Sequence, residues 1–255
     1  MPTAPTVARP AMPANGLPKR VATALSGPPP AAVLAPRQAV RRSRFASAVA
    51  WLALAGFSAL FGLVRARRSD ALDLALTLKL QRRRHPRFGR LMEAVSWPGF
   101  PPQSRLIPPL VIGLLVALRL RLEALFVVGA WGTALLSTVI KAGVRRPRPI
   151  AGEKLLVVVA PLGGSSFPSG HVLSYVGFYG FLAYLAEILV RPVAIRRAIV
   201  GALLGLIALV GPSRIHQGHH WFTDVTASYL LGTSYVIGLA ALYRRVKARR
   251  ANVRP

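Results

Sequence analysis

The sequence predicts an all-α membrane protein in which six transmembrane helices form a bundle, with an amphipathic interfacial helix between the first two. Of its 255 residues, 53% are hydrophobic and only 16% are charged, whereas soluble domains carry about 25% charged residues. The apolar residues fall in long stretches with few charges, and basic residues cluster between these stretches. Such basic flanks are typical of integral membrane proteins.

The charge balance is strongly basic, because 34 Lys and Arg residues face only 7 Asp and Glu residues, giving a net charge of +27. In a soluble protein this excess would indicate a nucleic-acid partner. Here the basic residues flank apolar runs, so we expect the bilayer as partner, no nucleic acid, and no obligatory protein partner. The chain has no cysteine, which excludes disulfides and cysteine-based metal sites.

Composition divides the chain into three regions. Residues 1–44 hold nine of the 22 prolines within their first 36 positions, which predicts a disordered tail. Residues 45–243 form the predicted membrane domain, and residues 244–255 form a basic C-terminal tail. The first apolar run, 45–64, is long enough to cross a bilayer and ends in a basic stop-transfer pattern at 65–68, which favours a membrane helix over a signal peptide.

Five further apolar runs complete the predicted set of spans. They cover residues 106–118, 122–140, 168–190, 198–212 and 222–243. Between the first two spans, Leu72, Leu76 and Leu80 share one helical face within residues 70–100. This spacing predicts a helix that lies in the membrane interface, with the arginines at 82–84 reaching lipid phosphates.

An even number of spans places both termini on the same side of the membrane. If that side is the cytoplasm, inner segments hold 18 basic residues and outer segments hold 16. The positive-inside rule therefore barely decides the orientation.

Polar residues gather at three span ends that alternating topology places on one membrane face. The three clusters are residues 141–149, 168–171 and 213–224. Arginine forks bind phosphate oxygens in pairs, and lysine adds a point charge. Pro168 at a helix start, followed by the small Ser169 and Gly170, leaves backbone N–H groups free to face an anion. The clusters therefore predict a phosphate site.

The histidines of these clusters suggest catalysis as well as binding. His220 and Asp224 are four residues apart, so on a helix the carboxylate can hold one imidazole nitrogen protonated and leave the other free to attack. His171 comes from another helix and is available as a general acid. Alternatives remain for single pieces: Lys141, Arg145 and Arg146 as interfacial snorkelling residues, and His216, His219 and His220 as a metal site.

Taken together, the clusters resemble the three-part signature of the type 2 phosphatidic acid phosphatase superfamily. The matching positions are Lys141 with Arg148-Pro149, Pro168-Ser169-Gly170-His171, and Ser213-Arg214 with His220 and Asp224. That superfamily includes lipid phosphate phosphatases, bacterial acid phosphatases and vanadium haloperoxidases. The resemblance covers roughly residues 45–243, and the tail 1–44 has no counterpart.

The resemblance implies a role for each signature residue. His220 would be the nucleophile that forms a phosphohistidine, Asp224 would orient it, and His171 would protonate the departing oxygen. The phosphoryl oxygens would be held by Lys141, Arg148, Ser169, Gly170 and Arg214. The family works without metal or other cofactor, and its site lies at the outer face of the cell membrane, which here implies cytoplasmic termini.

The sequence thus predicts a membrane phosphatase that hydrolyses a lipid phosphate or polyprenyl diphosphate. Two alternatives use the same pocket: a transporter or flippase that only binds lipid headgroups, and a vanadate-dependent oxidase. The complete histidine and aspartate set disfavours the first, and the lack of a sizeable soluble domain disfavours the second. Phosphatidate, phosphatidylglycerophosphate, undecaprenyl diphosphate and lipid A phosphates all stay open as substrates.

Overall fold

The computed structural model describes residues 36–82, 85–149, 155 and 162–252. All regular elements in this part of the chain are helical, which confirms the predicted all-α fold. In chain order they are α2 (Pro36–Arg65), α3 (Asp70–Gln81), α4 (Pro86–Ser96), η1 (Trp97–Gly99), α5 (Gln103–Ala117), α6 (Arg121–Trp131), α7 (Thr133–Val144), α8 (Gly170–Ser174), η2 (Tyr175–Tyr179), α9 (Gly180–Leu189), α10 (Val193–His216) and α11 (Phe222–Asn252).

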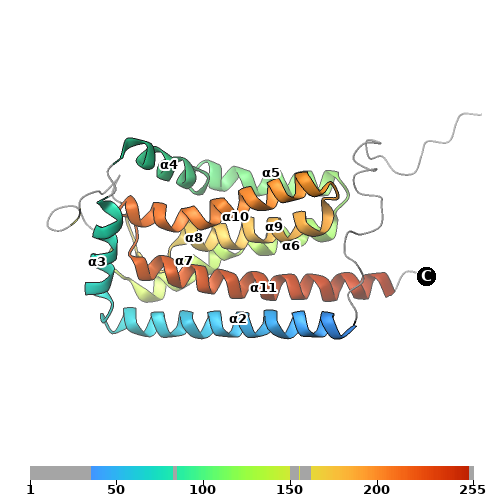
Figure 1. Ribbon diagram of the computed structural model, residues 1–255, viewed down its shortest axis with the longest axis horizontal. Helices are drawn as coiled ribbons and strands as arrows, with labels where there is room; N and C mark the ends of the chain where they lie inside the picture. The colour runs from blue at the N-terminus through green and yellow to red at the C-terminus, as the bar shows by residue number, and fades with distance from the viewer. Residues whose placement is uncertain (1–35, 83–84, 150–154, 156–161, 253–255) are drawn as a thin grey trace, which may run out of the picture.

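Most of these helices run along the longest axis of the molecule, while α3 lies across one end (Figure 1). Within the described residues, five helices are long and apolar enough to cross a membrane: Arg41–Arg65, Arg121–Val144, Gly170–Leu189, Val193–His216 and Phe222–Arg250. The pair Pro86–Gly99 and Gln103–Ala117 meets at a 57° bend and forms a sixth crossing if it is one broken span. The chain is therefore a multi-pass membrane protein.

The first helix is longer than the predicted span, because it begins at Pro36 rather than at residue 45. Proline is favoured at the first position of a helix, where its missing N–H costs nothing. The predicted tail 1–44 therefore overlaps the start of α2, and its residues 1–35 lie outside the described residues. From this start α2 runs beside α11 over most of its length (Figure 1).

The predicted interfacial helix over 70–100 is two helices, α3 and α4, in the structure. Pro86 starts the second helix, and the arginines at 83–84 lie outside the described residues. The face that α3 turns to the protein is polar, because Asp73, Thr77 and Gln81 are buried there, whereas Leu72 is exposed. Helix α3 thus contributes polar side chains to the end of the bundle.

Three apolar clusters among the described residues hold the bundle together, and two of them position the site. One packs aromatic residues of α6, α9 and α11, including Phe126, Phe181 and Tyr243. The other lies nearer α3 and packs α8 and η2 against α10 and α11. Close contact of η2 with α7 needs Gly177, because a Cβ there would lie 2.3 Å from Thr133 Oγ1. This close approach sets the position of α8, which carries part of the predicted site.

The two ends of the bundle differ in what they hold. The start of α2 and the end of α11 lie at one end, whereas α3, the end of α7 and the connection from α10 to α11 lie at the other (Figure 1). The three polar clusters of the sequence therefore meet at the end away from the start of α2 and the end of α11.

Candidate active site

The first cluster follows the end of α7. Arg145 adopts a left-handed conformation with φ 49°, which ends the helix and turns the chain. The extended segment that follows is held on both sides: Ser166 N donates to Arg146 O at 2.9 Å, and Trp221 Nε1 donates to Pro147 O at 3.1 Å. Residues 146–149 are thereby fixed against the α10–α11 connection.

The second cluster begins α8, where Ser169 is the N-cap. Its backbone N–H donates to Asp224 O at 3.4 Å, which ties the start of α8 to α11. A Cβ on Gly170 would lie 3.3 Å from Ser137 Oγ and 3.8 Å from Lys141 Cε, so the missing side chain allows α7 to come close. Lys141 Nζ donates to Ser165 O at 2.7 Å.

The third cluster is the tight connection from α10 to α11. Gly218 has φ 69°, a left-handed conformation that glycine adopts without strain. The N–H groups of His219 and His220 then both point to Arg214 O, at 3.1 Å and 3.3 Å. Helix α11 starts two residues later at Phe222. This compact turn carries Arg214, His219 and His220 to the same end of the bundle.

The two ring nitrogens of His220 face different partners. Nε2 lies 3.2 Å from Arg148 Nη1, and because an arginine only donates, Nε2 must accept. The proton of the neutral ring then sits on Nδ1, which lies 3.6 Å from Asp224 Oδ2. Burial, with the nearby charges of Lys141, Arg148 and Arg214, holds the pKa of His220 well below its usual value. A buried, neutral imidazole with its lone pair on Nε2 is suited to nucleophilic attack.

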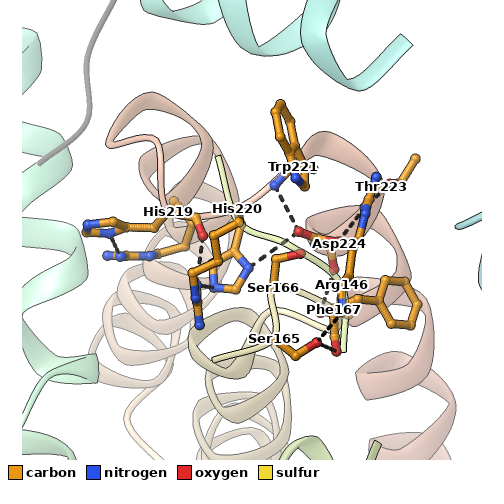
Figure 2. Close-up of polar contacts among 12 residues, drawn as sticks. Arg146, Ser165, Ser166, Phe167, His219, His220, Trp221, Thr223 and Asp224 are labelled. Carbon is orange, nitrogen blue, oxygen red and sulfur yellow. Dashed lines mark hydrogen bonds and ion pairs between the residues drawn. The ribbon is translucent and has the colours of Figure 1, made fainter. Parts of the chain in front are cut away.

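Asp224 is held by groups other than His220 (Figure 2). Trp221 N donates to its Oδ2 at 2.9 Å, and Arg146 Nη1 donates to its Oδ1 at 2.6 Å. The contact to His220 Nδ1 is longer than a hydrogen bond. Catalytic contacts in structures without substrate are often long and tighten once substrate binds. The carboxylate is therefore well positioned, and a small shift brings it into contact with the ring.

Both signature arginines are partly or fully buried beside the histidines. Arg148 donates from Nε to Gly163 O at 3.0 Å and from Nη1 to His219 O at 2.8 Å, and burial lowers its pKa. Arg214 is completely buried, donates to Gln217 Oε1 at 2.7 Å, and contacts His219 Nδ1 through Nη2. These carbonyl and side-chain contacts hold each guanidinium in a fixed place.

His171 packs under the turn η1. Its ring lies edge-on to Phe100, with centroids 4.6 Å apart. A Cβ on Gly99 would lie 2.2 Å from His171 Cδ2, so only glycine leaves room for this imidazole. The described residues offer no hydrogen-bond partner to its Nε2.

Several buried polar atoms of the site share this lack of a partner among the described residues. They are Ser137 Oγ, Ser169 Oγ, His171 Nε2, Arg214 Nε and His220 Nδ1. Buried polar groups are nearly always hydrogen-bonded in folded proteins, so such a group of exceptions calls for an explanation. An anion with several acceptor oxygens, such as a phosphoryl group, would satisfy most of them at once.

A cavity of about 360 Å³ adjoins this cluster on the side of His171. Polar and apolar groups share its wall, including Lys141, Gly170, His171, Ile107, Trp131 and Phe178. The signature residues Lys141, Gly170 and His171 thus face a mainly apolar space between α5, α7, α8 and η2. A group attached to a phosphate in the site can extend into this space.

The structure brings all eight predicted site residues to one end of the bundle, and it adds two that the sequence analysis did not include. Arg146, considered there only as a snorkelling residue, is buried and pairs with Asp224. Asp73, from α3, pairs with Arg146 at 2.6 Å. The sequence contains a signal for Asp73, because Asp73, Thr77 and Gln81 form a polar stripe at four-residue spacing on a leucine-rich helix.

The three histidines of the alternative metal site point to different neighbours. His216 packs edge-on against Phe88, with centroids 5.0 Å apart, and His219 Nδ1 contacts Arg214. Among the described residues, no three His, Cys, Asp or Glu side chains converge as metal ligands would.

Comparison with known proteins identifies the family. The sequence model of the PAP2 superfamily matches residues 122–248. Phosphatidylglycerophosphatase B of Bacillus subtilis (strain 168) is 31% identical over 156 residues, which are 58% of this chain and 72% of that protein. The chain belongs to the PAP2 superfamily. This membership confirms the predicted class of enzyme, a membrane lipid phosphatase.

Two solved structures share the fold. The transmembrane PAP2-type phosphatidylglycerolphosphate phosphatase from Bacillus subtilis matches with a TM-score of 0.65 and 22% identity, covering 76% of this chain and 96% of that one. LpxE of Aquifex aeolicus matches with a TM-score of 0.54 and 22% identity, covering 67% and 95%. Both structural matches cover a larger part of this chain than the family model does.

Proposed function

We propose that this PAP2 enzyme hydrolyses a lipid phosphate or polyprenyl diphosphate through a phosphohistidine on His220, without a metal ion. The observation that carries the proposal is the state of His220: a buried neutral ring whose Nε2 faces the cationic cluster and whose Nδ1 faces Asp224. A protein that only binds headgroups needs the cations but not this arrangement.

In the first step, Nε2 of His220 attacks phosphorus while the bond from phosphorus to the lipid oxygen breaks. His171 gives a proton to the departing oxygen, and the charge that develops on His220 is stabilised by Asp224. In the second step, His171 takes a proton from water, which attacks the phosphohistidine and releases phosphate and free His220. Lys141, Arg148 and Arg214 hold the phosphoryl oxygens throughout, and Arg148 Nη1 turns from Nε2 to one of those oxygens.

A lipid substrate is supported by the location of the site. The site lies at one end of a membrane bundle, and the cavity beside His171 has an apolar wall that fits a lipid leaving group. The names of two relatives from Bacillus subtilis refer to phosphatidylglycerophosphate. A phosphorylated glycerolipid is therefore the first substrate to test, followed by polyprenyl diphosphates, phosphatidate and lipid A phosphates.

The arrangement of the bundle also supports an orientation. We infer that both termini lie in the cytoplasm and that the site faces the outer side of the cell membrane. The start of α2 and the end of α11 lie at the opposite end of the bundle from the polar clusters, as this orientation requires.

The decisive experiment is phosphate release by the purified full chain in detergent from a panel of these lipids. We expect release from at least one lipid, persistence of activity in excess EDTA, and inhibition by orthovanadate. His220→Ala should reduce release to background while lipid binding persists. Headgroup binding without release by the wild type would favour a transporter or flippase, and activity lost in EDTA and restored by Zn²⁺ would contradict the metal-free mechanism.

A further inference from the structure

Helix α3 supplies a buried carboxylate to the site that the proposed mechanism does not use. We propose that Asp73 is a positioning residue for the reaction, acting through Arg146 on the Asp224–His220 pair. This inference rests on the proposed function and deepens it.

Asp73 uses both carboxylate oxygens, and only 1% of the residue is exposed. Its Oδ1 accepts from the backbone N–H of Thr223 at 2.8 Å. Its Oδ2 accepts from Thr223 Oγ1 at 2.8 Å and from Arg146 Nη2 at 2.6 Å. Because Thr223 lies in the first turn of α11, Asp73 caps that helix from another element. The cap fixes α11 one residue before Asp224.

Arg146 connects the two carboxylates. Its Nη2 donates to Asp73, and its Nη1 donates to Asp224 Oδ1 at 2.6 Å and to Thr223 Oγ1 at 2.8 Å. Burial disfavours its charge, but the carboxylates of Asp224 and Asp73 outweigh burial and raise the pKa of Arg146. The guanidinium is therefore a fixed cation shared between two buried anions.

Because Arg146 is shared between two carboxylates, the charge on Asp73 determines how much of the negative charge of Asp224 is available to His220. Asp73, Arg146 and Asp224 together carry one net negative charge, which is available to stabilise the positive charge that develops on the ring during attack. Without the charge on Asp73, Arg146 would neutralise Asp224 alone. Buried charges are screened weakly by solvent, so this change reaches His220.

The groups that face His220 come from every element around it. Lys141 on α7, Arg148 on the following segment, Arg214 on α10 and His171 on α8 add positive charge or a titratable ring. Among the described residues, Asp224 on α11 is the only carboxylate that faces the ring. Because the other charges are positive, the net negative charge shared by Asp224, Arg146 and Asp73 is the main opposing contribution. Removing one negative charge therefore makes protonation of His220 harder.

The test compares Asp73→Asn with Asp70→Asn in the purified full chain. Asp70 is a matched control, because it lies one turn earlier on α3, is exposed, and reaches Arg146 only at 3.6 Å. For Asp73→Asn we expect kcat to fall roughly tenfold or more, as for loss of a buried charge partner. Its KM should change little, and the acid limb of its kcat/KM profile should move to lower pH. For Asp70→Asn, kcat and KM should stay within about twofold of the wild type, and the acid limb should not move.

Two further variants separate charge from packing. Thr223→Val removes the hydroxyl contacts to Asp73 and Arg146 but keeps every charge, so it should lower the Tm without moving the acid limb. If Asp73→Asn does not fold, Asp73→Glu keeps the charge with a displaced carboxylate, and we expect lower kcat with the acid limb unmoved. Three outcomes would overturn the proposal. The acid limb could stay unmoved in folded Asp73→Asn, it could move in Asp73→Glu, or it could shift equally in Asp70→Asn and Asp73→Asn.

Failure of the proposed role of Asp73 can be distinguished from failure of the proposed function. If the wild type releases phosphate and His220→Ala does not, the proposed function holds whatever Asp73→Asn does. In that case, normal kinetics and a normal pH profile in Asp73→Asn would refute only the role of Asp73.

Discussion

His220 receives opposite influences at its two nitrogens, and the balance between them controls its protonation. Under the proposed mechanism, Arg148 faces the nitrogen that attacks, whereas Asp224 faces the nitrogen that keeps its proton. Burial and the surrounding cations favour the neutral ring, which is the form proposed to attack. In that mechanism, a phosphoryl group entering the site would bring negative charge that offsets these cations and would draw Arg148 away from Nε2. The substrate itself would thereby free the proposed nucleophile.

The lowered pKa of His220 predicts the acid side of the pH profile. A histidine with the usual pKa of about 6.5 would lose its neutral form as the pH falls through that value. Burial and the neighbouring cations hold the pKa of His220 below it, so the neutral form persists at more acidic pH. For a substrate without a titration in this range, we expect the acid-side fall of kcat/KM to begin only below pH 6.5. A fall beginning above pH 6.5 would contradict this environment for His220.

Arg148 gives a prediction about geometry rather than charge. Its Nε and Nη1 atoms are held in place by Gly163 O and His219 O. Arg148→Lys keeps the charge but loses the planar fork, so kcat/KM should fall roughly ten- to hundredfold. Arg145→Lys is the matched control, because Arg145 is exposed on the same segment and should tolerate lysine. Equal losses in both variants would mean that interfacial charge alone matters at this segment.

At the scale of elements, η1 determines where His171 lies. Gly99 ends η1, and its missing side chain leaves the space that the His171 ring occupies. His171, the proposed acid for the leaving group, is thus positioned by a turn outside the three signature clusters. The effect of moving that acid depends on the leaving group, because a more basic oxygen needs a proton more.

Gly99→Ala tests this contact. The added Cβ would lie 2.2 Å from His171 Cδ2 and must displace the ring. With phosphatidate, whose leaving group is an alkoxide, we expect hydrolysis to fall about 10²-fold or more. A polyprenyl diphosphate should be affected less, because its leaving lipid phosphate has a second pKa of about 6.

The matched control is Gly113→Ala on α5, where an added Cβ meets nothing within 4 Å. It should leave both rates unchanged. Equal losses on both lipids in Gly99→Ala would mean that His171 binds phosphate rather than acting as an acid.

The element scale also shows which parts of the site could be predicted from sequence. The spacing of His220 and Asp224 predicted their proximity on one helix, but His220 lies in the turn two residues before α11 begins at Phe222, so their contact depends on that turn. Gly99, Asp73 and Arg146 reach the site from separate segments, and their contacts depend on how α3, η1 and α7 pack. The leucine spacing of α3 predicted a helix in the membrane interface, whereas the polar stripe of the same helix faces the protein. The predicted start of α11 at Phe222 matches the structure, but α11 ends at Asn252 rather than at residue 243 and so includes most of the predicted C-terminal tail. Helix α10 extends beyond both ends of the predicted span 198–212, and α2 begins at Pro36 rather than at residue 45.

On the scale of the whole molecule, the site lies at the opposite end of the bundle from the start of α2 and the end of α11 (Figure 1). The basic residues of the sequence divide almost equally between the two sides, so charge alone could not predict the orientation. Several arginines on the site side have roles in the site instead: Arg146, Arg148 and Arg214 are held in its contacts.

The absence of cysteine from the sequence makes the proposed orientation directly testable. Arg68→Cys places a thiol on the exposed turn between α2 and α3, and Arg249→Cys places one near the end of α11. In intact cells a membrane-impermeant maleimide should label the first variant and not the second. After permeabilisation it should label both. The reverse pattern in intact cells would place the site on the cytoplasmic side.

The contact between α3 and α11 has a consequence for exchanging parts between relatives. The family model covers residues 122–248, which include every signature residue but not α3. A chimaera that exchanged only this stretch would inherit Arg146, Thr223 and Asp224 while taking from its host whatever lies at position 73. Where the host lacks a carboxylate there, the transplanted arginine would have one anion instead of two. Compatibility between hosts and grafts should therefore depend on the helix that precedes the exchanged stretch.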